Sequence, residues 1–97
     1  MTGVLICDDH RIVRQGIKQV LADAPEIRVL AEASDGEEAL RLVAAMREQL
    51  QVVLLDIALP GVDGLEVLQR LRRSEPTLPV LMLSTYPERQ YAVRCIK

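Results

Sequence analysis

The fold of this chain is decided by residues 52–64, which read Val-Val-Leu-Leu-Asp-Ile-Ala-Leu-Pro-Gly-Val-Asp-Gly. The first four residues form a continuous apolar run, which is typical of a parallel strand covered on both faces. The run stops at Asp56, so we predict this carboxylate at the C-terminal end of a strand. The Pro-Gly and Asp-Gly pairs that follow predict a loop that turns away from the sheet. Ligands of open α/β sheets bind outside this edge, which makes Asp56 a candidate site residue.

Three more segments predict strands, and helical patterns separate them. The strands cover residues 4–7, 28–33 and 80–83, of which 28–33 is the least apolar and therefore nearer an edge of the sheet. A helix is predicted after each strand from apolar residues at helical spacing, namely Ile12, Val13, Ile17, Val20 and Leu21, then Ala39, Leu40, Val43 and Ala44, then Leu65, Val67, Leu68 and Leu71, and last Tyr91, Ala92, Val93 and Ile96. Strands that alternate with helices predict a parallel sheet with right-handed crossovers.

Local signals position the helices. Asp35, followed three residues later by Glu38, resembles a capping box that starts the second helix. Pro76 and Pro79 end the third helix, because proline removes a backbone donor and clashes with the preceding turn. Gly16 lies on the first helix, where we expect it to allow a close contact between helix and sheet.

A parallel sheet gathers polar residues that are distant in the sequence. Asp8 and Asp9 follow one strand, Asp56 follows a second, and Ser84 and Thr85 follow a third. Carboxylates about 4 Å apart repel by about 4 kcal/mol at an effective dielectric constant near 20, so a cluster of three needs a cation or a proton. Hard oxygen ligands with room for water suit Mg²⁺. We therefore predict a magnesium site for phosphoryl chemistry, with a carboxylate that attacks and a hydroxyl that hydrogen-bonds the transferred group.

Other ligand classes have less support in the sequence. There is no glycine-rich loop of the Walker type, so a nucleotide is not indicated. With one histidine and no closely spaced cysteine pair, the sequence does not indicate a Zn²⁺ site. We interpret His10 as an exposed loop residue beside the site, because a carboxylate that attacks directly needs no additional base.

Composition narrows the function further. The 97 residues make one small domain with a net charge of -2, and its basic residues are dispersed, which gives little support for direct nucleic-acid binding. No apolar run approaches the roughly 20 residues of a membrane span, and no leader is visible, so we expect a cytoplasmic protein without membrane contact. Cys7 and Cys95 lie outside any metal-binding spacing and are expected to be reduced thiols.

Four motifs, in order along the whole chain, resemble the receiver domain of two-component response regulators. They are Asp8-Asp9 after the first strand, residues 33–40, Asp56 with Pro60 and Gly64 behind it, and Ser84 after the fourth strand. The Asp9-His10 pair and residues 14–16 are similar to the branch whose receivers precede a LuxR-type helix-turn-helix output domain. The resemblance implies a flavodoxin-like (CheY-like) doubly wound α/β fold with strand order 2-1-3-4.

The resemblance also implies how the acidic residues act. Asp56 would be the phosphoacceptor, which takes a phosphoryl group from a sensor histidine kinase or from a small donor such as acetyl phosphate. Asp9 and Asp56 would ligate Mg²⁺ through their carboxylates, Asp8 would ligate it through a water molecule, and Ala58 through its backbone carbonyl.

The remaining matched residues would form the switch. Ser84 would hydrogen-bond the phosphoryl group and shift toward it, and Thr85 and Tyr86 would lie in the loop that moves. Phosphorylation adds about -1.5 to -2 charge, which can bias a loop with two states that differ by a few kcal/mol. The chain would then be a phosphoacceptor switch rather than an enzyme, and it would control a transcriptional output domain outside this sequence.

The sequence departs from the family at its C-terminal end. Receiver domains carry a fifth strand and a fifth helix, and a lysine before that strand pairs with the phosphoryl group. Lys97 lies a few residues short of this position, so it is not assigned the role. We expect residues 1–97 to form a receiver domain that is incomplete at its C-terminus. Residues 80–83 would then be an exposed apolar edge, which predicts self-association or a dimer.

Two other functions stay open at this point. A phosphohydrolase of the haloacid-dehalogenase type carries a second acid two residues after its nucleophilic aspartate, where this sequence has Ala58. A receiver-like module that only mediates protein contacts would need neither Mg²⁺ nor a phosphoryl donor.

Overall fold

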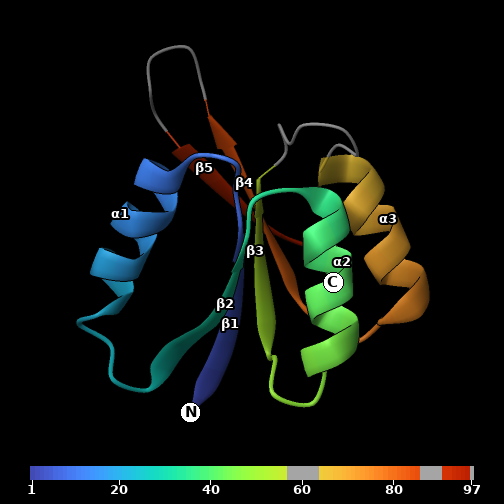
Figure 1. The fold of residues 1–97 in the computed structure, drawn as a ribbon, viewed down its shortest axis with the longest axis horizontal. Helices are drawn as coiled ribbons and strands as arrows, with labels where there is room; N and C mark the ends of the chain where they lie inside the picture. Colours follow the sequence, from blue (N-terminus) through green and yellow to red (C-terminus); the bar gives the residue numbers. More distant parts are fainter. Residues whose placement is uncertain (57–63, 86–90, 97) are drawn as a thin grey trace.

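The computed structural model describes residues 1–56, 64–85 and 91–96, with the backbone alone for residues 84, 85 and 91–96. A five-stranded sheet forms the centre of the fold (Figure 1), and its strands follow one another across the sheet in the order β2-β1-β3-β4-β5. Their bounds are β1 (Thr2–Cys7), β2 (Ile27–Ala33), β3 (Val52–Asp56), β4 (Val80–Thr85) and β5 (Tyr91–Ile96). The first four strands are parallel, which confirms the predicted flavodoxin-like order 2-1-3-4.

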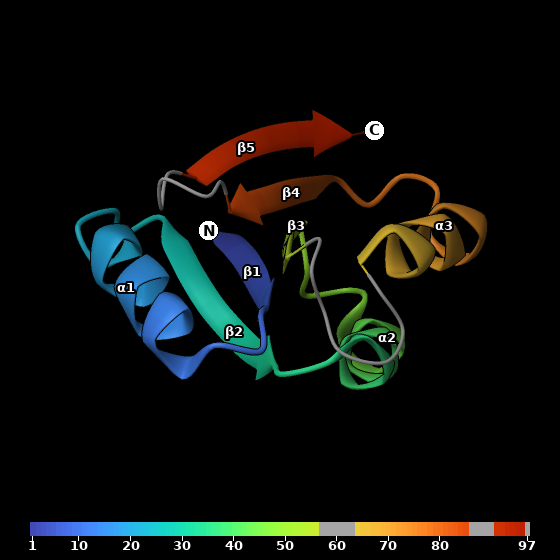
Figure 2. The same cartoon turned by 90° about the horizontal axis from the view of Figure 1, so that it is seen from above.

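Within the described residues, three helices cover the sheet. Their bounds are α1 (Arg11–Leu21), α2 (Gly36–Met46) and α3 (Gly64–Ser74). Figure 2 shows α2 and α3 together on one face of the sheet and α1 alone on the other, beside β2. None of the helices in the described ranges has both the length and the hydrophobicity that a bilayer crossing requires.

The main core lies between the sheet and the layer formed by α2 and α3. Residues four apart share one face of a helix, and both Ala39 with Val43 and Val67 with Leu71 are buried there. Alternate strand residues face the same layer, and those that join this core are Leu5, Cys7, Val53, Leu55, Val80 and Met82. Ile6 is also fully buried, so β1 is covered on both faces. In β3, where the apolar run predicted cover on both faces, Val52 and Leu54 are only half-buried.

The predicted fourth helix is wrong, because residues 91–96 form a strand. β5 runs antiparallel to β4 and pairs with it along all six residues, from Val80 opposite Ile96 to Thr85 opposite Tyr91. The predicted exposed edge at residues 80–83 is therefore also wrong. The physical reason is that an edge strand offers a row of unpaired backbone donors and acceptors, and a short segment rich in strand-forming residues satisfies them by pairing.

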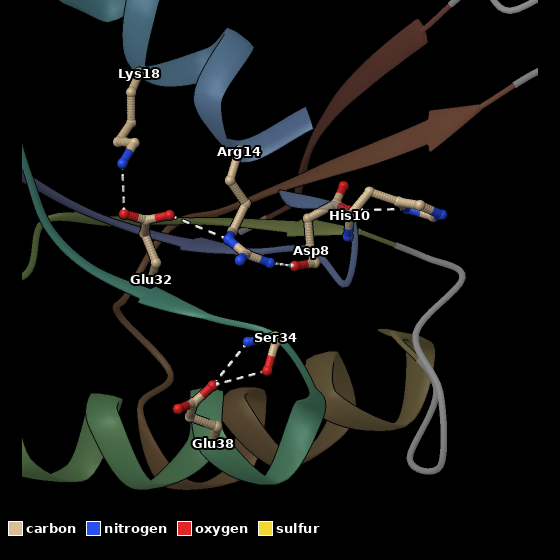
Figure 3. Close-up of polar contacts among 7 residues, drawn as sticks. All are labelled: Asp8, His10, Arg14, Lys18, Glu32, Ser34 and Glu38. Carbon is tan, nitrogen blue, oxygen red and sulfur yellow. Dashed lines mark hydrogen bonds and ion pairs between the residues drawn. The ribbon is translucent and has the colours of Figure 1, made fainter. Parts of the chain in front are cut away.

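The predicted start of α2 is confirmed. Asp35 is the N-cap residue, and its carboxylate accepts a hydrogen bond from the backbone N–H of Glu38 at 2.8 Å. The Glu38 carboxylate accepts in return from the backbone N–H of Ser34 at 2.8 Å and from its hydroxyl at 3.2 Å (Figure 3). These reciprocal bonds satisfy donors that the first helical turn leaves without partners.

The apolar side of α1 is open rather than buried. No residue of this helix is buried, and the side chains of Ile12 and Val20 are 86% and 75% exposed. An apolar groove of about 520 Å³ runs along the helix, lined by Ile12, Val13, Gly16, Ile17, Val20, Leu21 and Leu83. The expected close contact at Gly16 is wrong, since a Cβ atom built there meets nothing within 4 Å.

Ion pairs hold α1 against β2. The Glu32 carboxylate on β2 accepts from Arg14 Nε at 3.1 Å and from Lys18 Nζ at 2.8 Å (Figure 3). The hydrogen bond from Lys18, helped by Arg14, lowers the pKa of Glu32 below its ordinary value of 4.5. Because the folded pKa is lowered, the contribution of Glu32 to stability is complete above pH 4.5 and is lost as the pH falls through the lowered value.

We expect Glu32→Gln to destabilise the chain by about 0.2–1 kcal/mol at pH 7, the usual range for a solvent-exposed ion pair. Urea unfolding from pH 7 down into the acid range measures the difference, which should shrink toward zero below pH 4.5 as the wild-type carboxylate becomes protonated. The matched control is Glu48→Gln at an exposed position, which should change stability little at any pH. A Glu32→Gln deficit that persists in acid would show that packing, not charge, carries the effect.

Candidate functional site

The site forms where β1 and β3 end side by side. Cys7 is opposite Leu55 in the parallel register of these strands, so the next residue on each strand, Asp8 and Asp56, comes to the same point of the sheet edge. Both carboxylates are buried, with 2% of Asp8 and 5% of Asp56 exposed. The pairing of β1 with β3 thus places two acidic side chains where water has little access to them.

Four side chains converge at this edge. One ligand atom from each of Asp8, Asp9, His10 and Asp56 lies within 4.8 Å of all the others. The two inner carboxylates are buried, whereas the side chains of Asp9 and His10 are 31% and 65% exposed. The cluster therefore has a closed inner side and a side that opens to solvent.

A tight turn fixes the first acidic residues. Asp8 Oδ1 accepts a hydrogen bond from the backbone N–H of His10 at 2.7 Å, and His10 is the N-cap residue of α1. The guanidinium of Arg14 donates to the backbone carbonyl of Asp8 (Figure 3), and the backbone N–H of Arg14 donates to the carbonyl of His10 at 3.1 Å. The first turn of α1 thus holds the acidic loop against the sheet.

The thiol of Cys7, next to Asp8, is affected by the negative charge at this edge. The pKa of Cys7 is raised from 9.0 to about 12, mainly because the thiol is buried and then because the carboxylates of Asp35, Asp8 and Asp56 lie nearby, in that order of importance. The Cys7 thiol donates to the backbone carbonyl of Asp35 at 3.5 Å. Cys7 therefore stays protonated at neutral pH, and it is a core residue rather than a nucleophile or a metal ligand.

The donor set fits a divalent cation. Three carboxylates this close repel one another, and a cation between them removes that cost. Oxygen ligands from one or two carboxylates together with water are the usual surroundings of Mg²⁺. Asp8 Oδ1 already accepts from the His10 backbone, which suits a contact to the cation through water better than a direct one. Asp9 and Asp56 are then the residues that would hold the cation directly.

The other predicted site residues are described only in part. Ser84 and Thr85 are the last residues of β4, and Leu83 before them is opposite Asp56 of β3, so their backbone lies at the same sheet edge as the acidic cluster. Ala58 and Tyr86 lie outside the described residues. The parallel topology thus brings the Ser84 backbone next to the end of β3, as its position after a strand predicted.

The sequence analysis did not predict the contacts that His10 and Arg14 make at the site. His10 is exposed, as expected, but its Nδ1 lies 2.9 Å from Asp9 Oδ1 and 3.2 Å from Asp8 Oδ1. Arg14 supports the Asp8 carbonyl. The spacing of four residues between His10 and Arg14 was the available signal, because such residues lie on one face of a helix.

A family comparison identifies the domain. Residues 4–97 match the family model described as the response regulator receiver domain. Among similar proteins is the response regulator UvrY of Escherichia coli O6:H1 strain CFT073, which is 40% identical over 88 residues. The match covers 91% of this chain and 39% of UvrY, so the chain spans less than half the length of this relative.

Solved structures agree with this result. The chain is similar to a LuxR-family two-component response regulator from Aurantimonas sp. SI85-9A1, with a TM-score of 0.81, 31% identity, and coverage of 89% of this chain and 61% of that one. It is also similar to a chain of the CheX-CheY-BeF3-Mg²⁺ complex from Borrelia burgdorferi, with a TM-score of 0.82, 28% identity, and coverage of 86% and 61%. This chain therefore belongs to the receiver domain family of two-component response regulators.

Proposed function

We propose that this receiver domain accepts a phosphoryl group on Asp56 from a sensor histidine kinase in a reaction that depends on Mg²⁺. The observation that carries the proposal is the convergence of Asp8, Asp9 and Asp56, whose ligand atoms lie within 4.8 Å of one another. Family membership supports the same chemistry. The CheY complex with BeF3 and Mg²⁺ is a family example in which both a phosphoryl mimic and the metal are named.

The chemistry of the transfer follows from the carboxylate at the end of β3. An oxygen of Asp56 attacks the phosphorus of a phosphohistidine, the P–N bond breaks as the new O–P bond forms, and the histidine ring leaves with a proton from solvent. Bound Mg²⁺ would neutralise the charge that gathers on the phosphoryl oxygens. Asp9 and Asp56 would hold the metal directly, Asp8 through water and Ala58 through its carbonyl. The Ser84 hydroxyl would hydrogen-bond the transferred group.

The phosphorylated state would act as a signal. The added charge at the sheet edge would bias the segment after β4, which includes Thr85 and Tyr86, toward a second arrangement. An output domain that reads this arrangement would regulate transcription, and the protein would work in the cytoplasm. Asp56 would gain and lose the phosphoryl group without turning over other substrates, so the domain is a switch rather than an enzyme.

Intact-mass spectrometry after incubation with acetyl phosphate and Mg²⁺ tests the proposal. A single adduct with the mass of one phosphoryl group is the expected result, and it should require the metal. Continued hydrolysis of phosphate esters would favour the haloacid-dehalogenase type of hydrolase instead. A chain that stays unmodified with acetyl phosphate and with phosphorylated kinase would be a contact module.

We also propose that this 97-residue chain associates with itself, now on different grounds from the exposed β4 edge predicted from the sequence. The supporting observation is the apolar groove along α1, where Ile12 and Val20 are mostly exposed. Exposed apolar patches of this kind are typical of interaction sites. Burial of two such grooves against each other would remove these side chains from water.

Light scattering over a range of concentrations measures this association. The apparent mass of the wild-type chain should rise from one chain toward two, and Ile12→Asp should keep it at one, because a charge in the apolar groove opposes burial. Gln15→Asp adds the same charge to a polar position of the same helix and should leave the association intact. A wild-type mass of one chain at the highest concentration would exclude the dimer.

A further inference from the structure

We infer that His10 is an additional metal ligand, which lets the cation site select borderline transition metals such as Ni²⁺ in addition to Mg²⁺. This inference rests on the proposed cation site of Asp8, Asp9 and Asp56. Its basis is that one ring nitrogen of His10 lies within 4.8 Å of a carboxylate oxygen of every acidic residue in the cluster. His10 is the only histidine of the chain.

The distances around His10 suit coordination to a shared ion. Two ligands at right angles on bonds of about 2.1 Å are about 3.0 Å apart, and two opposite ligands are about 4.2 Å apart. The Nδ1 atom lies 2.9 Å from Oδ1 of Asp9, the proposed direct ligand, which is close to the first of these values. It lies 3.2 Å from Oδ1 of Asp8, which would contact the ion through water. No two ligand atoms of the cluster are more than 4.8 Å apart. A shift of well under 1 Å would therefore bring even the most distant two close to the separation of opposite ligands.

The backbone around His10 holds the ring at the cluster although the ring is exposed. Its N–H donates to Asp8 Oδ1 at 2.7 Å, and its carbonyl accepts from the backbone N–H of Arg14 at 3.1 Å. With 65% of its side chain exposed, His10 closes the solvent side of a cluster whose inner side is made by the buried Asp8 and Asp56. An ion can thus enter past the imidazole and be ligated by it.

The chemistry of the donor decides which ions benefit. Carboxylate and water suit Mg²⁺, whereas imidazole nitrogen suits Ni²⁺, Cu²⁺ and Zn²⁺, which also rank above Mn²⁺ in general affinity for such sites. A site with only the three acidic residues would offer these ions no nitrogen ligand. The added nitrogen raises the affinity for Ni²⁺ and leaves Mg²⁺, which gains little from imidazole, almost unaffected.

Titration calorimetry of the untagged chain with Ni²⁺ and separately with Mg²⁺ tests the inference, in a Cys95→Ser background so that this thiol does not compete. The His10→Asn variant keeps a polar side chain but lacks the imidazole nitrogen. It should bind Ni²⁺ at least about tenfold more weakly, in the range typical of disturbed metal-ligand sets, while its Mg²⁺ affinity changes by less than about threefold. Asp9→Asn is the control for the shared site and should weaken the binding of both ions.

A spectroscopic readout identifies the ligand independently of affinity. With Co²⁺ bound, strongly shifted imidazole proton resonances in NMR spectra can come only from His10, because the chain has no other histidine. Equal Ni²⁺ affinity in wild type and His10→Asn, or Co²⁺ spectra without imidazole resonances, would overturn the inference and leave the Mg²⁺ site standing. Failure of the wild-type chain to bind either Mg²⁺ or Ni²⁺ would overturn the proposed cation site and the role of His10 together.

Discussion

The Asp56→Asn variant should gain no phosphoryl group under conditions in which the wild-type chain gains one. An amide oxygen does not replace a carboxylate as a nucleophile, because it carries no negative charge to form the new O–P bond. The change also removes one of the three carboxylates that converge on the cation site. We therefore expect complete loss of the adduct in intact-mass spectra with acetyl phosphate and Mg²⁺.

Matched variants make this result specific. Asp23→Asn is the same chemical change at an exposed position after α1, and it should accept the phosphoryl group as the wild-type chain does. Asp9→Asn keeps the nucleophile but removes a metal ligand, so it should form the adduct roughly tenfold more slowly and recover in part at higher Mg²⁺. An adduct on Asp56→Asn would move the phosphoacceptor to another residue, which peptide mapping would then locate.

Gly3→Ala should be the most damaging small substitution in the described part of the chain. A Cβ atom at Gly3 in β1 would fall on the backbone carbonyl oxygen of Gln49 and lie 2.6 Å from Leu30 Cδ1. The backbone of Gly3 is itself tied on both sides, since its N–H donates to Gln51 Oε1 and its carbonyl accepts from the backbone N–H of Gln51 at 2.9 Å. These bonds hold Gly3 in place, and the backbone carbonyl of Gln49 cannot move aside as the end of a flexible side chain can.

The expected loss is about 3 kcal/mol, at the upper end of overpacking effects. For a domain of this size it corresponds to a fall in melting temperature of roughly 12–24 °C. Gly16→Ala is the matched control, because a Cβ atom there meets nothing within 4 Å, and alanine in a helix is favoured over glycine by about 0.5–1 kcal/mol. Thermal unfolding should thus show opposite signs for the two variants, and equal signs would contradict the role of the β1 contact.

The strands and helices that could be predicted are those whose own residues impose one pattern. β1 and β3 are apolar runs that stop at an aspartate, and α2 has a capping box and an apolar stripe that agree on its start. Residues 91–96 carry two patterns at once, since their apolar residues suit both a helical and an alternating spacing. Pairing with the free edge of β4 decided between them. The six residues alone do not indicate that a free strand edge is available for pairing.

The candidate site also has residues that the sequence predicted and residues that it did not. The sequence placed Asp8 and Asp56 after strands, and parallel topology requires that such residues meet. The position of the His10 ring was not predictable, because it depends on how the turn between β1 and α1 is folded around the Asp8 side chain. Gly3 and Gly16 look alike in sequence, and only the surroundings of each one separate a glycine that is needed from one that is not.

The sequence by itself thus determined the parallel βα order, the receiver family and the acidic residues of the site, because these follow from local hydrophobic patterns and from motifs at strand ends. Only the tertiary structure decided that β5 pairs with β4, that α1 keeps an open apolar side, and that the His10 ring lies beside the acidic cluster. The physical reason is that these features depend on contacts between segments that are distant in the chain. The free energy of such contacts cannot be deduced from a local sequence pattern.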